Sequence, residues 1–152
     1  MVPWESMREL LDDVIVSMTK RMAGIDMERT SSGCLPDESA ASALITEIIG
    51  TDDFTLVYHA DNALLLEIAQ KMKRRPVEDM DEVGEYTREY FNIICGHMIS
   101  QLNRREKSSL RFSMPRYLPA PFDKTEEDQN AFVLHYQSPK GSAKVQGIYT
   151  NK

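Results

Sequence analysis

Apolar residues recur at helical spacing through the middle of the chain and predict a long helix from about Met80 to Asn103. Its start is marked by Asp79 and, three residues later, Glu82, an arrangement typical of a capping box. One side of this helix is expected to face the core. The core-facing positions are Val83, Thr87, Tyr90, Phe91, Ile94, Met98 and Leu102.

Two more helices are predicted before this one. From Trp4 to Met22 the apolar residues keep an i, i+3, i+4, i+7 rhythm, with Pro3 placed for a first helical turn. A second helix is expected from Asn62 to Arg74, with Asp61 or Asn62 available as its cap.

Short runs of apolar residues bounded by turn residues predict the strands. Gly50 to Asp53 supplies turn residues for a hairpin between the first two strands. Prolines near residue 120 belong at a strand edge or in a connection, because proline has no backbone donor. In chain order the expected strands are Ala43–Ile49, Phe54–His59, Ser108–Met114, Phe132–Tyr136 and Lys144–Thr150.

The element order is therefore α-β-β-α-α-β-β-β. This order favours an α+β fold in which a mainly antiparallel sheet packs against long helices. The chain has 152 residues, which predicts a single domain, residues 1–152.

Polar residues line the opposite face of the long helix. At about 100° per residue, Glu85, Glu89, Asn92, Gly96 and Asn103 all fall within an arc of about 60°. A glycine inside a helix costs roughly 1 kcal/mol relative to alanine. Its place on this polar stripe suggests that another molecule approaches closely there.

Ile99 falls at the edge of the same stripe. It is either an anchor for a docked partner or a lone surface isoleucine, which needs no explanation.

Composition excludes several classes of function. The net charge of −6 argues against nucleic acid as a partner, because phosphate binding needs a basic face. No segment approaches 18 consecutive apolar residues, so no membrane span is expected. The N-terminus lacks the pattern of a secretion signal, and we expect a cytoplasmic protein.

Candidate metal and nucleophile sites are weak. The histidines His59, His97 and His135 have no ligand spacing between them, and no metal site is expected. Cys34 and Cys95 are too few for a disulfide framework. The sequence contains no G-x-S-x-G elbow, P-loop or dinucleotide fingerprint.

The spacing of Glu89, Asn92 and Gly96 resembles the signature helix of the CheC/CheX family of chemotaxis phosphatases, which dephosphorylate the response regulator CheY. The order of elements is also similar to that family, over roughly residues 3–150. A single E-x-x-N motif resembles CheX and not the two-motif pattern of CheC. Glu85 departs from the pattern, because the family often has Asp or Ser at that position.

The resemblance implies a mechanism. The partner would be a phosphorylated CheY-type receiver domain, with Asn92 orienting the hydrolytic water and Glu89 engaging the receiver's active-site lysine. Gly96 would leave room for the receiver, and Glu85, Ile99 and Asn103 are further candidates for partner contact. No cofactor of this chain is implied, because the Mg²⁺ would belong to the receiver.

Two alternatives stay open. The same helix would also serve a non-catalytic module that binds a receiver or a component of the flagellar-switch type. A purely structural homodimer would leave the stripe in solvent. Dimerisation is itself expected from the resemblance, because CheX-like proteins pair through their sheets and the C-terminal strands offer an edge.

Overall fold

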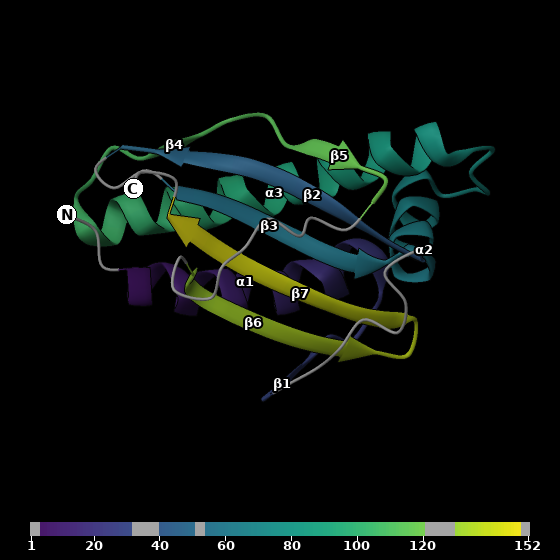
Figure 1. The fold of residues 1–152 in the computed structure, drawn as a ribbon, viewed down its shortest axis with the longest axis horizontal. Helices are drawn as coiled ribbons and strands as arrows, with labels where there is room; N and C mark the ends of the chain where they lie inside the picture. The colour runs from purple at the N-terminus through teal and green to yellow at the C-terminus, as the bar shows by residue number, and fades with distance from the viewer. Residues whose placement is uncertain (1–3, 32–39, 51–53, 121–129, 150–152) are drawn as a thin grey trace.

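The structure is a computed structural model that describes residues 4–31, 40–50, 54–120 and 130–149. It is an α+β fold with one antiparallel sheet, and α1 and α3 lie behind that sheet in Figure 1. The predicted class and element order are confirmed, with β1 and β5 as additional short strands. In chain order the elements are α1 (Trp4–Ala23), β1 (Glu28–Thr30), β2 (Ala41–Ile49), β3 (Phe54–Asp61), α2 (Asn62–Lys73), α3 (Met80–Glu106), β4 (Arg111–Phe112), β5 (Arg116–Leu118), β6 (Asn130–Ser138) and β7 (Gly141–Tyr149).

The strands pair in the order β1-β6-β7-β3-β2-β4, and β5 also pairs with β2. The predicted hairpin is confirmed, because β2 and β3 pair from Ala41 with Asp61 to Ile48 with Phe54. Its turn falls on residues 51–53, outside the described part of the chain. Pro115 and Pro119 flank β5, a short edge strand, which agrees with the expectation for a residue without a backbone donor. Pro121 lies outside the described residues.

The long helix matches its prediction closely. α3 begins at Met80 and ends at Glu106, three residues beyond the predicted end, and all seven predicted core positions are buried. α1 packs beside α3, and α2 packs against both. In Figure 1, α2 covers one end of the molecule. No described helix combines the length and apolar character that crossing a membrane requires.

Caps fix where α3 begins. The side chain of Asp79 accepts a hydrogen bond from the Glu82 backbone N–H at 3.0 Å, as predicted. The Glu82 carboxylate reaches back to the N–H of Glu78 at 2.7 Å and also pairs with Lys73 at the end of α2. Hydrogen bonding by the Lys73 ammonium holds the pKa of Glu82 below its usual value. The two helices are thus joined at a defined point.

The cap predicted for α2 is only partly correct. Asp61 occupies the N-cap position, but its side chain makes no capping hydrogen bond. Its carboxylate instead accepts from the Ser142 backbone N–H at 2.7 Å, which ties the start of α2 to β7. A tertiary contact has replaced the local one.

The prediction that the C-terminal strands offer an edge is wrong for β7. β7 lies inside the sheet, between β3 and β6, and offers no edge. β6 is partly covered by β1, which pairs with it from Glu28 opposite Gln137 to Thr30 opposite His135. The interior place of β7 follows from its long pairing with β3. Strand pairing between two copies through β7 is therefore not available.

Candidate functional site

The polar stripe on α3 divides into an exposed part and a covered part. Glu85 and Glu89 are exposed, and Asn92 and Gly96 are partly exposed. Glu89 and Asn92 are separated by three residues, so they lie about 4.5 Å apart along the helix axis. The first four stripe positions therefore form one accessible line on the helix surface.

The side chains of this line are not used by the fold. Within the described residues, no hydrogen bond or ion pair engages Glu85, Glu89 or Asn92. The guanidinium of the neighbouring Arg88 turns back to the Gly84 carbonyl, to which its Nε donates at 3.3 Å. Two carboxylates and a carboxamide are thus left available to another molecule.

Asn103, predicted as a partner contact, has a structural use instead. Its Nδ2 donates to the Leu110 carbonyl at 3.0 Å, and its Oδ1 accepts from the Leu110 N–H at 2.9 Å. The Ser108 hydroxyl donates to the same Oδ1 at 2.8 Å. The amide therefore closes the turn between α3 and β4, and the prediction that it faces a partner is not supported.

The predicted surface position of Ile99 is wrong. The residue is only 6% exposed and belongs to the hydrophobic core. The 100° periodicity places Ile99 at the margin of the stripe, but the turn closed by Asn103 and the strand β4 beyond it pack along this end of α3. Ile99 cannot anchor a partner without leaving the core.

Two glycines of α3 have different surroundings. A Cβ on Gly84 would lie 2.6 Å from Cδ2 of Tyr117, so this glycine is required by the packing of β5 on the helix. A Cβ on Gly96 would meet only Cζ of Phe112, at an ordinary 3.9 Å. The fold itself does not require a glycine at position 96. The close approach of a partner there stays a prediction.

Gly96 and Asn92 line an open depression of about 460 Å³. Its other lining residues are Ile93, His97 and Ser100 on α3 and Phe112 on β4. Sequence reasoning missed Phe112, because its place beside α3 depends on pairing between β4 and β2, where Phe112 lies opposite Ile48. The only available signal was an aromatic residue in the short segment that follows the helix.

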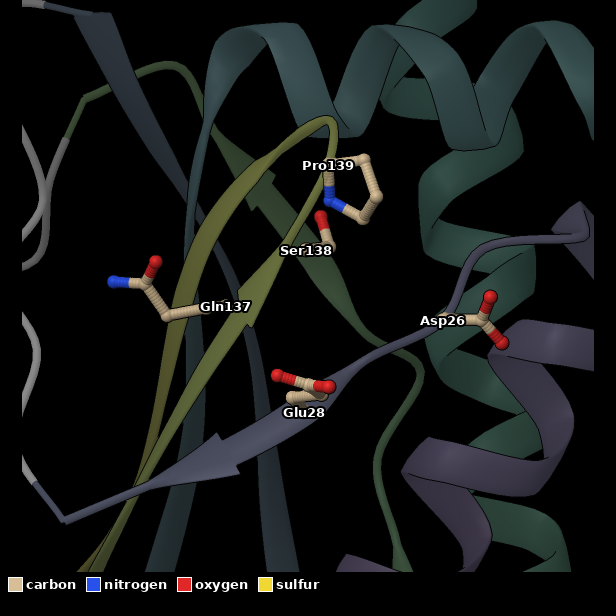
Figure 2. A pocket seen from close by; sticks show the side chains of 5 residues that line it. All are labelled: Asp26, Glu28, Gln137, Ser138 and Pro139. Carbon is tan, nitrogen blue, oxygen red and sulfur yellow. The ribbon is translucent and has the colours of Figure 1, made fainter.

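A second depression, of about 410 Å³, lies elsewhere and contains none of the predicted site residues. Figure 2 shows its lining side chains, with Asp26 just before β1, Glu28 at the start of β1, and Ser138 and Pro139 at the β6–β7 turn. Asp26 already pairs with Lys20 at 3.0 Å. We assign this depression no chemical role.

The described residues contain no group of three or more His, Cys, Asp or Glu side chains arranged to hold a metal ion. Cys95, the neighbour of Gly96, is a free thiol buried in the core. Burial raises its pKa well above the ordinary value, so it stays protonated and is no nucleophile. The chemistry of this surface rests on the carboxylates and the amide.

An amide side chain is neither a base nor a nucleophile near neutral pH, but it both donates and accepts hydrogen bonds. Asn92 is therefore suited to orient a water molecule, and Glu89 is suited to bind a cation one turn away. In phosphoryl transfer, positioning of the attacking water and charge stabilisation account for most of the catalysis. The geometry fits a surface that completes a reaction centre on another molecule.

Comparisons with solved structures confirm the fold. Chemotaxis protein CheX from Desulfovibrio desulfuricans is 10% identical, with a TM-score of 0.77, and the match covers 94% of this chain and 98% of that one. CheX in the CheX–CheY–BeF3–Mg²⁺ complex from Borrelia burgdorferi is 16% identical, with a TM-score of 0.75 over 94% and 97% of the two chains. A CheC-like superfamily protein from Shewanella sp. PV-4 is 18% identical, with a TM-score of 0.76 over 96% and 98%.

Among curated proteins, none matches the sequence significantly. The family model for chemotaxis phosphatase CheX matches residues 42–134. This match spans more than half of the chain and includes all of α3, with the exposed line from Glu85 to Gly96. The chain therefore belongs to the CheX family of chemotaxis phosphatases.

Proposed function

We propose that this protein hydrolyses the aspartyl phosphate of a CheY-type receiver domain in the cytoplasm. One observation carries the proposal: the Asn92 amide stands on the accessible face of α3 with no partner among the described residues, one turn from the equally unpaired Glu89. Membership of the CheX family supplies the reaction class. The Borrelia relative forms a complex with CheY, BeF3 and Mg²⁺, which makes a receiver the natural partner for this chain too.

In the proposed reaction Asn92 enters the receiver's site and holds a water in line with the phosphorus. The water oxygen attacks phosphorus, the bond from phosphorus to the aspartyl oxygen breaks, and the receiver's carboxylate leaves with inorganic phosphate as the other product. The water's proton passes to phosphate or solvent, because an amide cannot accept it. The Mg²⁺ belongs to the receiver, so this chain needs no cofactor of its own.

Glu89 is proposed to pair with the receiver's active-site lysine. An ion pair formed at the edge of an interface and then shielded from water contributes both to affinity and to alignment. Glu85, one turn earlier and also exposed, would extend the same acidic edge toward the receiver. Gly96 would let the receiver's surface approach the helix backbone.

The alternative is a module that binds a receiver, or forms a homodimer, without catalysis. The two functions differ in turnover. Decay of the phosphorylated receiver is measured alone and with substoichiometric amounts of this protein, with phosphate release followed over several turnovers. A phosphatase accelerates the decay of the whole receiver pool. A sequestering module leaves the rate constant of free receiver unchanged, and binding without acceleration would overturn the proposal.

A further inference from the structure

The depression beside Asn92 has an apolar centre. Ile93 and Phe112 pack against the core but keep part of their side chains accessible, and Gly96 lies between them without a side chain of its own. Phe112 is held here by the pairing of β4 with β2 and by the turn that Asn103 closes. The aromatic wall of the depression is thus fixed by the fold.

Gly96 contributes only backbone to the lining of the depression. A methyl group at this position would fit against Phe112 at 3.9 Å and would add helix propensity. The chain has glycine at this position despite both advantages of a methyl group, and the space stays accessible to a group of another molecule. Phe112, Ile93 and the bare backbone offer van der Waals contact to an apolar side chain.

Charge along α3 defines how such a partner is oriented. On the stripe itself the exposed residues before the depression are acidic, at Glu85 and Glu89, and the depression is lined by uncharged groups and His97. The exposed Arg88 lies beside the stripe, with its Nε donating to the Gly84 carbonyl. The last turn of the helix carries Arg104 and Arg105. At 1.5 Å per residue, Glu89, Asn92 and Gly96 are spaced by about 4.5 and 6 Å along the axis. The complementary surface therefore presents a cation, then the phosphoryl group, then an apolar side chain, in that order.

We infer that the depression receives one apolar side chain of the receiver, and that Phe112 is the residue that positions this side chain. This inference rests on the proposed function and adds to it the apolar contact that fixes how Asn92 enters the receiver's site. Well-packed, desolvated contacts near the centre of an interface contribute a large share of the binding energy.

Four variants test the inference. Phe112→Ala removes the wall, Phe112→Leu keeps an apolar wall, and Ser100→Trp fills the depression from an exposed position without removing a core contact. Leu118→Ala is the matched control, because Leu118 is an exposed apolar residue on β5 outside the depression. KM and kcat for the phosphorylated receiver, and Kd for the receiver activated with BeF3, are measured for each, together with stability in urea.

Phe112→Ala and Ser100→Trp are expected to raise KM and Kd about tenfold, a change that corresponds to about 1.4 kcal/mol, with kcat within about threefold. Phe112→Leu and Leu118→Ala are expected to stay within about threefold of wild type in all three constants. Wild-type KM and Kd in Ser100→Trp and in folded Phe112→Ala would overturn the inference. Binding without phosphatase activity in the wild-type protein would overturn the proposed function alone, since Kd still tests the depression.

Discussion

The hydroxyl of Tyr90 on α3 lies 2.6 Å from Oγ1 of Thr19 on α1. The same hydroxyl lies 2.9 Å from that of Tyr58 on β3, so one buried group joins two helices and the sheet. Burial raises the pKa of Tyr90 to about 12, and the phenol stays neutral. Tyr90 is the neighbour of Glu89, and fixing its ring inward fixes the rotation of α3 that turns Glu89 outward.

Tyr90→Phe is expected to lower the free energy of unfolding by about 1 to 3 kcal/mol, because it leaves two buried hydroxyl groups without their shared partner. Urea unfolding measures the change. The double variant with Tyr58→Phe is expected to lose less than the sum of the two single variants, because both remove the same contact. If the two losses of unfolding free energy were strictly additive, the hydroxyl of Tyr90 would not be the partner that Tyr58 relies on, and the prediction would be contradicted.

The two glycines of α3 give opposite predictions. Gly84→Ala is expected to destabilise the fold by about 1 to 3 kcal/mol, because its methyl group would overlap the Tyr117 ring. Gly96→Ala is expected to stabilise the helix by up to about 1 kcal/mol and yet to weaken receiver binding. Thermal unfolding and receiver affinity measured on the same samples test this pair. A Gly96→Ala protein that is more stable and binds as wild type would contradict the close approach.

The two asparagines of the stripe form a matched pair on one helix. Asn103→Ala is expected to cost about 1 to 3 kcal/mol of stability, because it removes the three hydrogen bonds that close the turn to β4. Asn92→Ala is expected to change stability by less than about 0.5 kcal/mol, because its side chain makes no contact of this kind within the described chain. If Asn103→Ala and Asn92→Ala lost the same free energy of unfolding in urea, this distinction would be refuted.

His59 predicts a dependence of stability on pH. Burial, and then the charge of Lys144 opposite it on β7, lower the pKa of His59 from 6.5 to about 4. The unfolded chain therefore takes up the proton first, and the stability due to neutral His59 is lost as pH falls from about 6.5 to about 4. His59→Gln is expected to flatten the stability curve in this window by on the order of 2 kcal/mol relative to wild type. If the unfolding free energies of wild type and His59→Gln changed with pH in parallel, His59 would not be the source of the pH dependence.

Local patterns predicted most of the fold. The apolar periodicity of α3 and the capping residue Asp79 are contained within a few turns of chain, and both match the structure. The short strands β1 and β5 were not predicted, because three-residue segments carry almost no periodic signal. The interior place of β7 depends on pairing across the whole sheet and is likewise invisible to a local pattern.

The candidate site shows the same difference between local pattern and tertiary packing. The helical angle alone places Glu85, Glu89, Asn92 and Gly96 on one face, and the structure leaves all four accessible. The angle places Asn103 and Ile99 nearby too, but the segment after α3 folds back over them. Whether a stripe position faces solvent depends on what packs against the helix, and that is tertiary information.

The decisive measurement for the proposed phosphatase compares Asn92→Ala with wild type in both affinity and turnover. If Asn92 orients the water, the variant binds a BeF3-activated receiver within a few-fold of wild type but hydrolyses the aspartyl phosphate about 10²-fold more slowly, because the oriented water is lost. Turnover by folded Asn92→Ala at the wild-type rate would contradict the assignment of Asn92 as the group that orients the water.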